Sequence, residues 1–226
     1  MTDRRTYGDS CGIARALDLV GERWALLVAR ELLLGPKRFT DLRTGLPKLS
    51  ADVLSQRLRE LERIGVVRRR RLPPPASAQV YELTEWGLEL EPVLLALGRW
   101  GSRAALPVEA PELGVDAVAV ALKTMFDPPT PRPAQVGYQL RLGEHSFAVR
   151  VAGDQIELTR GELTSPDAVI DTDSQTLAAL LWHGQPVKAA LDAGSLTIQG
   201  DKREARRFLR MFPPPVPAPA VSAGLA

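Results

Sequence analysis

The sequence predicts an α+β protein made of two domains, and two observations lead to this prediction. Up to about residue 104 helical periodicity dominates, interrupted once by a strongly basic hairpin. Residues 113–212 instead place strand-like alternation between helical runs, which predicts an antiparallel sheet covered by helices. The chain has 226 residues, of which 45% are hydrophobic, and this is enough for two modest cores.

Three helices are expected before residue 50. Apolar residues recur at helical spacing over residues 13–20 and again, more densely, over residues 24–32. Gly35 and Pro36 end the second helix, and a short third helix is expected over about residues 39–44. The turn 45–47, which contains glycine and proline, then leads to a fourth helix. A short helix, a glycine-containing turn and a second helix are the order of a helix-turn-helix.

The fourth helix is predicted over about Ala51–Ile64. Ser50 stands before it as a side-chain acceptor for the amides of the first turn, and Gly65 follows where a left-handed cap is expected. One face carries an apolar stripe that we expect to be core: Leu54, Leu58 and Leu61.

The opposite face of this helix carries groups that are able to read bases. Its members are Asp52, Gln56, Arg59 and Arg63, with Ser55 at the edge. Arginine pairs bidentately with guanine and glutamine with adenine. We therefore predict DNA contacts from this face, and we add Ser50 and Arg38 to them. The alternative is a solvated helix face, which is what most charged helix faces are.

A basic hairpin follows the fourth helix. Its first strand contains four consecutive arginines, Arg68, Arg69, Arg70 and Arg71. The tip, residues 72–79, contains three consecutive prolines, and the chain returns in a strand over Val80–Leu83. Residues 37–71 hold 11 basic and 4 acidic side chains, a net charge of +7, whereas the whole chain is only +2. Charge concentrated in this way predicts contact with phosphate, with the hairpin as the wing of a winged helix-turn-helix.

The helix after the wing is too apolar for one solvated helix. Its apolar side chains need a partner, although packing within the chain is an alternative. These side chains are Trp86, Leu90, Val93, Leu94, Leu97 and Trp100.

The second half of the chain has a different character, because residues 101–226 carry a net charge of −2. A linker is expected over 105–112 and a helix over Val115–Phe126. Strands are expected over 136–142, 146–151, 155–158 and 168–172 as an antiparallel meander joined by tight hairpins. Two helices between residues 173 and 192, a strand over 195–199 and a helix over 201–211 follow, and the Pro/Ala-rich tail 213–226 is expected to be disordered.

The residues that usually carry chemistry are sparse. His145 and His183 are far apart and have no Cys or paired carboxylate at ligand spacing, so we predict no metal site. No nucleophile-base arrangement or phosphate loop occurs, and we expect neither an enzyme nor a cofactor. Cys11 is the only cysteine, and a lone thiol in a chain without signal peptide or membrane span fits a reducing cytoplasm.

The first half of the chain, about Cys11–Gly101, resembles winged helix-turn-helix regulators of the HxlR type, which are relatives of the MarR group. The resemblance is carried by four spaced motifs: G-x-[RK]-W at Gly21–Trp24, R-F-x-D-L at Arg38–Leu42, L-S-x-R-L-R-E-L-E at Leu54–Glu62 and Y-x-L-T-x-x-G at Tyr81–Gly87. It implies a homodimer on double-stranded, palindromic operator DNA, with the helices near both ends of this domain at the interface. The interface residues are then Ile13 and Leu17 of the first helix together with Trp86, Leu90, Val93, Leu94, Leu97 and Trp100. Cys11 stands where members commonly carry a cysteine, which in some relatives is a redox sensor, although the proline that usually follows is Gly12 here. A sensor thiol needs a depressed pKa and solvent access, and the alternative is a small buried residue.

Residues from about Val115 to Met211 resemble the sterol carrier protein 2 family. Gly194–Asp201 matches its late G-x-[LI]-x-[IV]-x-G-D turn, and Asp173–Gly184 partly matches the helix that precedes it. The resemblance implies an apolar cavity for a lipid, a sterol or another hydrophobic molecule. The candidate walls are Phe126, Phe147, Leu177, Leu180, Leu181, Trp182, Phe208 and Met211. The same residues at this spacing also fit a plain core.

The expected domains are therefore 1–104 for DNA binding and dimerisation and 113–212 for the ligand. The expected function is a DNA-binding transcriptional regulator, a repressor, whose operator binding is modulated by a small hydrophobic effector. Two alternatives stay open. One is a redox-sensing regulator that acts through Cys11, and the other is a lipid-binding or carrier protein with an accessory DNA-binding domain.

Overall fold

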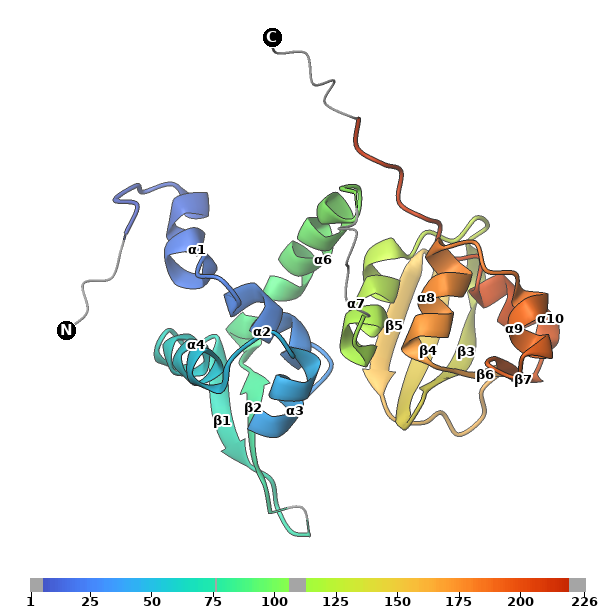
Figure 1. Cartoon of the computed structure of the whole chain (residues 1–226), viewed down its shortest axis with the longest axis horizontal. Coiled ribbons are helices and arrows are strands. Elements are labelled where there is room, and N and C mark those ends of the chain that lie inside the picture. The colour runs from blue at the N-terminus through green and yellow to red at the C-terminus, as the bar shows by residue number, and fades with distance from the viewer. Residues whose placement is uncertain (1–5, 76, 106–112, 220–226) are drawn as a thin grey trace. The chain divides into compact units, whose positions relative to one another are not determined.

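The computed structural model describes residues 6–75, 77–105 and 113–219. Its contacts divide the chain into two compact units, Met1–Leu94 and Leu95–Ala226 (Figure 1). The division falls inside a helix rather than in the linker predicted over 105–112, of which residues 106–112 lie outside the described residues. The domain limits drawn from the sequence stay a prediction.

The first unit contains the predicted helices and hairpin. Its elements are α1 (Gly12–Val20), α2 (Ala25–Leu32), α3 (Phe39–Gly45), α4 (Ala51–Arg63), β1 (Val67–Arg71), β2 (Gln79–Leu83), α5 (Glu85–Leu88) and the start of α6 (Leu90–Gly101). Strands β1 and β2 form an antiparallel hairpin that projects from the helices (Figure 1).

The predicted caps of α4 are confirmed. The Ser50 hydroxyl accepts a hydrogen bond from the Val53 amide at 3.4 Å. At the other end Gly65 has a φ of 80°, and the amide of Val66 donates to the carbonyl of Leu61 at 3.0 Å. This 6→1 bond satisfies a helix carbonyl and turns the chain sharply from α4 into the wing.

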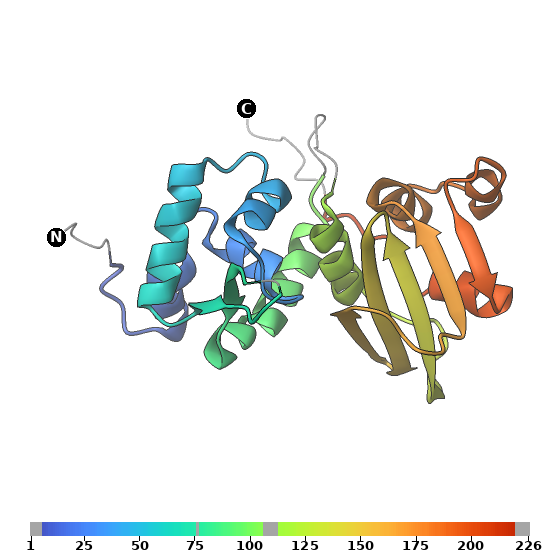
Figure 2. The same cartoon turned by 90° about the horizontal axis from the view of Figure 1, so that it is seen from below.

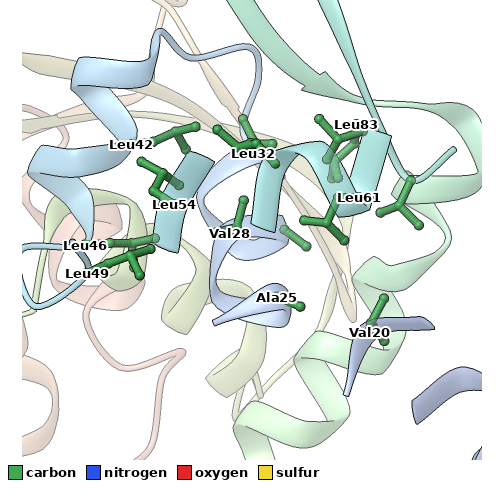
Figure 3. Packing of buried hydrophobic residues seen from close by; sticks show 14 of the residues in the cluster. Val20, Ala25, Val28, Leu32, Leu42, Leu46, Leu49, Leu54, Leu61 and Leu83 are labelled. Atoms are coloured by element: carbon green, nitrogen blue, oxygen red, sulfur yellow. The ribbon is translucent and has the colours of Figure 1, made fainter. Parts of the chain in front are cut away.

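The leucine stripe of α4 is confirmed as core. Leu54, Leu58 and Leu61 are buried against Val28 and Leu32 of α2 in one cluster (Figure 3). A buried ion pair lies in the same unit: Glu31 accepts from Lys37 Nζ at 2.6 Å. The Lys37 backbone also exchanges hydrogen bonds of 2.9 and 2.8 Å with Tyr81, which fastens the wing strand β2 to the segment before α3.

The helix predicted after the wing is divided into α5 and α6. The Thr84 hydroxyl caps α5 by accepting from the Gly87 amide at 3.0 Å. Pro92 lies in the first turn of α6, where a missing amide costs no intrahelical hydrogen bond. Leu94, predicted at the dimer interface, is instead buried within the first unit's core. Its position on α6 turns it toward the chain's own helices, so it is not available to a partner.

The second unit is a five-stranded sheet with helices. Its elements are α7 (Val115–Met125), β3 (Arg132–Leu142), β4 (His145–Gly153), β5 (Gln155–Arg160), β6 (Ala168–Thr172), α8 (Ser174–Trp182), α9 (Val187–Asp192), β7 (Thr197–Gly200) and α10 (Lys202–Phe208) (Figure 2). The strand order is β5-β4-β3-β6-β7.

The prediction of a purely antiparallel meander is wrong. The β3–β4 and β4–β5 hairpins are antiparallel as predicted, but β6 pairs with β3 in parallel. The reason lies in the segment between β5 and β6. Buried Gln139 on β3 accepts a hydrogen bond from the Leu163 amide at 2.8 Å, and the backbones of Gly137 and Asp167 are joined at 2.8 Å. These bonds hold the returning chain along the free edge of β3, so that the sheet is mixed.

The core of the second unit is built around aromatic rings. Phe208 lies 4.8 Å from Tyr138 and 4.9 Å from Phe212 between ring centroids, and Phe126 is 5.9 Å from Phe212. Phe212, fully buried, was assigned to neither the core nor the predicted walls, because it follows the last helix directly before a proline run. Residues 213–219 of the predicted disordered tail form no helix or strand, but the Ala218 amide donates to the Arg103 carbonyl at 2.8 Å. Residues 220–226 lie outside the described residues.

None of the helices that the structure describes is both long and apolar enough to cross a membrane.

Candidate nucleic-acid interface

The polar face of α4 is presented to solvent as predicted. Asp52, Gln56, Arg59 and Arg63 are exposed, as is Ser50, and Ser55 is half-buried. These side chains lie opposite the buried leucines, which fix the rotation of the helix about its axis. Gln56 Nε2 donates to Glu60 Oε1 at 3.0 Å, one helical turn on. The arrangement displays amide and guanidinium groups along one exposed side, which is the chemistry that base-edge reading requires.

One arginine of α4 has a different place. Arg57 is buried, and its guanidinium lies 2.6 Å from a Glu60 oxygen and 3.6 Å from Glu22. The ion pair with Glu22 fastens α4 to the turn between α1 and α2. The place of Arg57 in the helical repeat, beside Leu54 and Leu58, is the sequence signal for this burial.

The wing arginines are exposed but are held by carboxylates. Arg68 Nε donates to Glu82 Oε1 at 2.7 Å, and Arg70 Nε donates to Glu82 Oε2 at 2.9 Å. Arg69 donates to Glu62 Oε2 at 3.1 Å, and its guanidinium carbon lies 5.2 Å from the centre of the Tyr81 ring. From the sequence alone these arginines are expected to contact an external anion. In the structure Glu82 and Glu62 already supply anions from within the chain.

Glu82 is an acidic residue of the wing that the charge pattern of the sequence does not reveal. It lies directly opposite Arg68 in the antiparallel register, and its side chain is only 12% exposed. Burial by itself raises the pKa of this carboxyl group, but the hydrogen bonds from Arg68 and Arg70 outweigh it, so the pKa lies below its ordinary value. Side chains alternate between the two faces of each strand, and this alternation places Glu82 of β2 on the same face as Arg68 and Arg70 of β1. It is the sequence signal for these ion pairs.

The two other predicted DNA contacts are also accessible. Arg38 is exposed at the N-cap position of α3, where its amide donates to Asp41 Oδ2 at 3.0 Å. Arg71, at the end of β1, is exposed as well.

The predicted dimer surface is apolar and mostly exposed. Ile13, Leu17, Trp86, Val93, Leu97 and Trp100 are large hydrophobic side chains on the surface, Trp100 with 74% of its area accessible. Leu90 is partly buried against the core, and Leu94 belongs to it as described above. In the first unit a pocket of about 200 Å³ opens between Leu19 of α1, Val66, Trp86 and Leu90.

Cys11 is exposed and has no disulfide partner, which meets the requirement of solvent access. It stands at the N-cap position of α1, and its amide donates to Asp9 Oδ1 at 2.8 Å.

The predicted ligand walls lie in or beside the core of the second unit. Phe126, Phe147, Leu177, Leu181, Phe208 and Met211 are buried, whereas Leu180 and Trp182 are half-buried. The pocket beside Met211, which Tyr138 and Arg207 also line, has a volume of about 10 Å³. That is room for about one water molecule, whereas pockets for drug-sized ligands measure roughly 300–1,000 Å³. The packing therefore resembles that of a plain core, which was the alternative interpretation.

The acidic and sulfur-containing residues form no metal centre within the described ranges, where no three His, Cys, Asp or Glu side chains lie close enough to bind one ion.

Comparison with known proteins identifies the first half of the chain. Residues 19–108 match the family model described as HxlR-like helix-turn-helix. The chain is 40% identical over 88 residues to an uncharacterised HTH-type transcriptional regulator, YvaP, from Bacillus subtilis, covering 39% of this chain and 82% of that protein. It is 36% identical over 92 residues to the HTH-type transcriptional regulator YodB from the same organism, covering 41% and 82% of the two chains.

Among solved structures, the reduced form of YodB matches 42% of this chain and 94% of its own, at 34% identity and with a TM-score of 0.38. The family relationship rests on the sequence matches, which extend over four fifths of each curated relative. On this evidence the chain belongs to the HxlR-like helix-turn-helix family of transcriptional regulators, which are not enzymes.

Proposed function

We propose that this chain is a dimeric repressor that reads a palindromic operator with α4 and holds the DNA backbone with its wing. The observation that carries the proposal is the exposed face of α4, where Gln56, Arg59 and Arg63 point away from the buried leucine stripe. In a helix-turn-helix the second helix enters the major groove, and a dimer places two such helices about one helical turn apart. A dimer that covers both half-sites excludes another protein from the same stretch of promoter, and on this ground we assign repression.

The charge distribution supports phosphate binding by the same unit. Residues 37–71 have a net charge of +7, and Arg38, Arg59, Arg63 and Arg71 are exposed within this segment. Contacts to phosphate position a protein on DNA, whereas contacts to base edges supply the specificity. The wing therefore contributes affinity for any duplex, and α4 contributes discrimination between duplexes.

The proposal is tested by selecting duplexes that the purified full chain retains from a randomised pool. We expect enrichment of two inverted half-sites whose centres lie about 10 base pairs apart. Lower expression of a reporter gene whose promoter carries the selected site, in the presence of the protein, would support the assignment as a repressor. Retention of all duplexes alike would overturn the proposal of operator reading.

The exposed apolar surface supports the dimer. Ile13 and Leu17 of α1 and Val93 of α6 are large apolar side chains exposed on the first unit, and Leu97 and Trp100 are exposed on the part of α6 that belongs to the second unit. Exposed apolar area of this kind marks an interaction site. A second copy of this chain is the partner that we propose for it.

We also propose the second unit as the effector-binding part of the regulator. At the pocket beside Met211, which measures about 10 Å³, a hydrophobic effector of sterol size would displace core side chains. Binding would then raise the thermal stability of the second unit and change operator affinity by the ratio of the effector's affinities for the two states. A titration with a long-chain fatty acid that leaves both the melting temperature and the operator affinity unchanged would count against this role, and against the alternative of a lipid carrier.

A second mode of control is favoured by the exposure of Cys11. In a dimer, oxidation of two such thiols to an intersubunit disulfide would change the separation of the two α4 helices. Treatment with diamide, which oxidises thiol pairs to disulfides, is expected to produce a covalent dimer on a non-reducing gel and to alter operator affinity. The Cys11→Ser variant should show neither effect. An unchanged wild-type protein would exclude the redox alternative.

A further inference from the structure

We infer that Glu82 is a specificity-determining residue of the wing, a built-in competitor that occupies Arg68 and Arg70 and thereby lowers affinity for random DNA more than affinity for the operator. The inference rests on the proposed function, in which the wing contacts the DNA backbone. It adds a role for a carboxylate that does not itself bind DNA.

The geometry places one carboxylate under two arginines. Glu82 and Arg68 are direct partners in the register of the hairpin, and Arg70 is the diagonal neighbour on the same face. Each oxygen of Glu82 is used: Oε1 accepts from Arg68 at 2.7 Å and Oε2 accepts from Arg70 at 2.9 Å. The Glu82 side chain is 12% exposed, whereas those of Arg68 and Arg70 are 63% and 45% exposed. The carboxylate therefore lies beneath the guanidinium groups and leaves their outer edges to the solvent.

This arrangement keeps the arginines available for DNA while weakening them as charges. A guanidinium has five N–H donors, and the Nε bond of Arg68 to Glu82 leaves the donors of its two terminal nitrogens outside that contact. At Arg70, Nε and one terminal nitrogen both lie 2.9 Å from Glu82 Oε2, so the donors of the other terminal nitrogen stay outside the contact. A DNA phosphate can approach these outer donors, but it meets a net charge of about +1 from the three groups instead of +2. It also meets arginines whose positions the carboxylate has fixed.

The consequence differs between random DNA and an operator. Binding to random DNA depends almost entirely on the attraction between positive side chains and phosphates. The loss of one unit of positive charge on the wing therefore lowers the affinity for random DNA by the whole contribution of that charge. On an operator, contacts from α4 fix the register, and arginines that are already aligned meet their phosphates without further ordering. Glu82 therefore widens the ratio between operator and random affinity.

A purely structural role for the pair predicts a different result. Arg68 and Arg70 are 63% and 45% exposed, so their charges stay hydrated without Glu82, and a neutral residue at position 82 is expected to leave the hairpin in place. It would then change DNA binding only if the charge of Glu82 acts on the DNA.

The test compares Glu82→Gln with the wild-type full chain on a selected operator and on a scrambled duplex of the same length. For the variant we expect affinity for the scrambled duplex to rise about two- to fivefold, the size of one exposed charge interaction. Operator affinity should rise less, and the salt dependence of scrambled-duplex binding should become steeper by up to about one counterion. Glu82→Thr, a second neutral variant suited to a strand, should behave in the same way.

Two controls distinguish the effect of a negative charge at position 82 from the effect of the chain's net charge. Glu85→Gln removes one negative charge from an exposed position on α5 and should leave the ratio of operator affinity to random-DNA affinity unchanged. Glu82→Asp keeps the charge at position 82 and should keep the wild-type ratio. An unchanged ratio in both neutral variants, or the same change in Glu85→Gln, would overturn the inference while operator binding by the wild type stands. If the wild type itself fails to prefer the operator, the proposed function fails, and this inference fails with it.

Discussion

Arg69 of the wing joins the hairpin to the last turn of α4, because its guanidinium donates to Glu62 at 3.1 Å. The same group stacks on the Tyr81 ring, at 5.2 Å from the centroid. Arg69 is therefore a positioning residue for the wing as much as a charge. The distinction leads to a test that keeps the charge constant.

Replacing Arg69 by lysine preserves the charge but removes the planar group that stacks on Tyr81 and reaches Glu62. We expect operator affinity to fall several-fold, with an unchanged salt dependence, because the number of positive charges stays the same. Fluorescence anisotropy over a range of salt concentrations measures both quantities. Arg71→Lys, at an exposed position on the same strand, should remain within about twofold of the wild type. Equal losses in the two variants would mean that Arg69 acts only as one charge among four.

The dimer proposal predicts that a charge on the exposed face of α6 produces monomers. Val93→Asp places a carboxylate where an apolar side chain would be buried by the partner, and we expect the dimer to weaken by roughly 2 kcal/mol. Sedimentation velocity at micromolar concentration measures the change. Leu191→Asp is the matched control, since Leu191 is an exposed apolar residue on α9 of the second unit. If the Val93→Asp protein stayed dimeric, the dimer interface would lie on a surface that does not include Val93.

Gly87 is predicted to be intolerant of any side chain. It is buried in α5, and a Cβ atom at this position would collide with the Val66 carbonyl oxygen, a backbone atom at the base of the wing. We expect Gly87→Ala to lower the free energy of unfolding by about 1–3 kcal/mol, with a melting temperature several degrees lower. At Gly101, where a Cβ would meet nothing within 4 Å, alanine should not destabilise the chain. A Gly87→Ala protein as stable as the wild type would show that the base of the wing can shift.

Asp173 gives a stability contribution that depends on pH. Burial by itself raises the pKa of this carboxyl group, but hydrogen bonds from the Thr176 amide and hydroxyl, both at 2.7 Å, bring the pKa below its ordinary value of 3.8. A lowered pKa in the folded state means that the contribution is complete above the ordinary pKa and is lost as the pH falls through the folded pKa. Asp173→Ala should therefore cost about 1 kcal/mol at pH 7 and less at pH 3, as measured by urea unfolding. Asp173→Asn, which keeps the cap, should lower the stability at pH 7 less than Asp173→Ala does. If Asp173→Ala lowered the stability equally at pH 7 and pH 3, the charge of Asp173 would have no role.

Local signals allowed the first unit to be predicted closely. The cap Ser50, the left-handed Gly65 and the stripe Leu54, Leu58 and Leu61 are all specified by residues within one helix, so the sequence alone places α4 within one residue of its observed end. The wing followed from the same reasoning, because alternation and the proline run mark a hairpin without reference to distant residues.

The features that escaped prediction depend on residues distant along the chain. The parallel pairing of β3 with β6 is set by Gln139 and by the contact of Gly137 with Asp167, which lie about thirty residues apart. The ion pair between Glu82 and Arg68 needs the register of the hairpin, and the burial of Leu94 needs the packing of α6. The size of the pocket beside Met211 is decided by how side chains interlock, which the apolar character of the residues does not determine.

Base reading by α4, and by no other part of the chain, is measured by the DNA binding of the Arg59→Ala variant. Its binding is compared with that of Arg203→Ala, an exposed arginine on α10 of the second unit, on the selected operator and on a scrambled duplex. We predict that Arg59→Ala weakens operator binding by about 1–3 kcal/mol and scrambled-duplex binding much less, whereas Arg203→Ala changes neither. Equal losses on the two duplexes for Arg59→Ala, or an operator-specific loss for Arg203→Ala, would mean that α4 does not supply the sequence specificity.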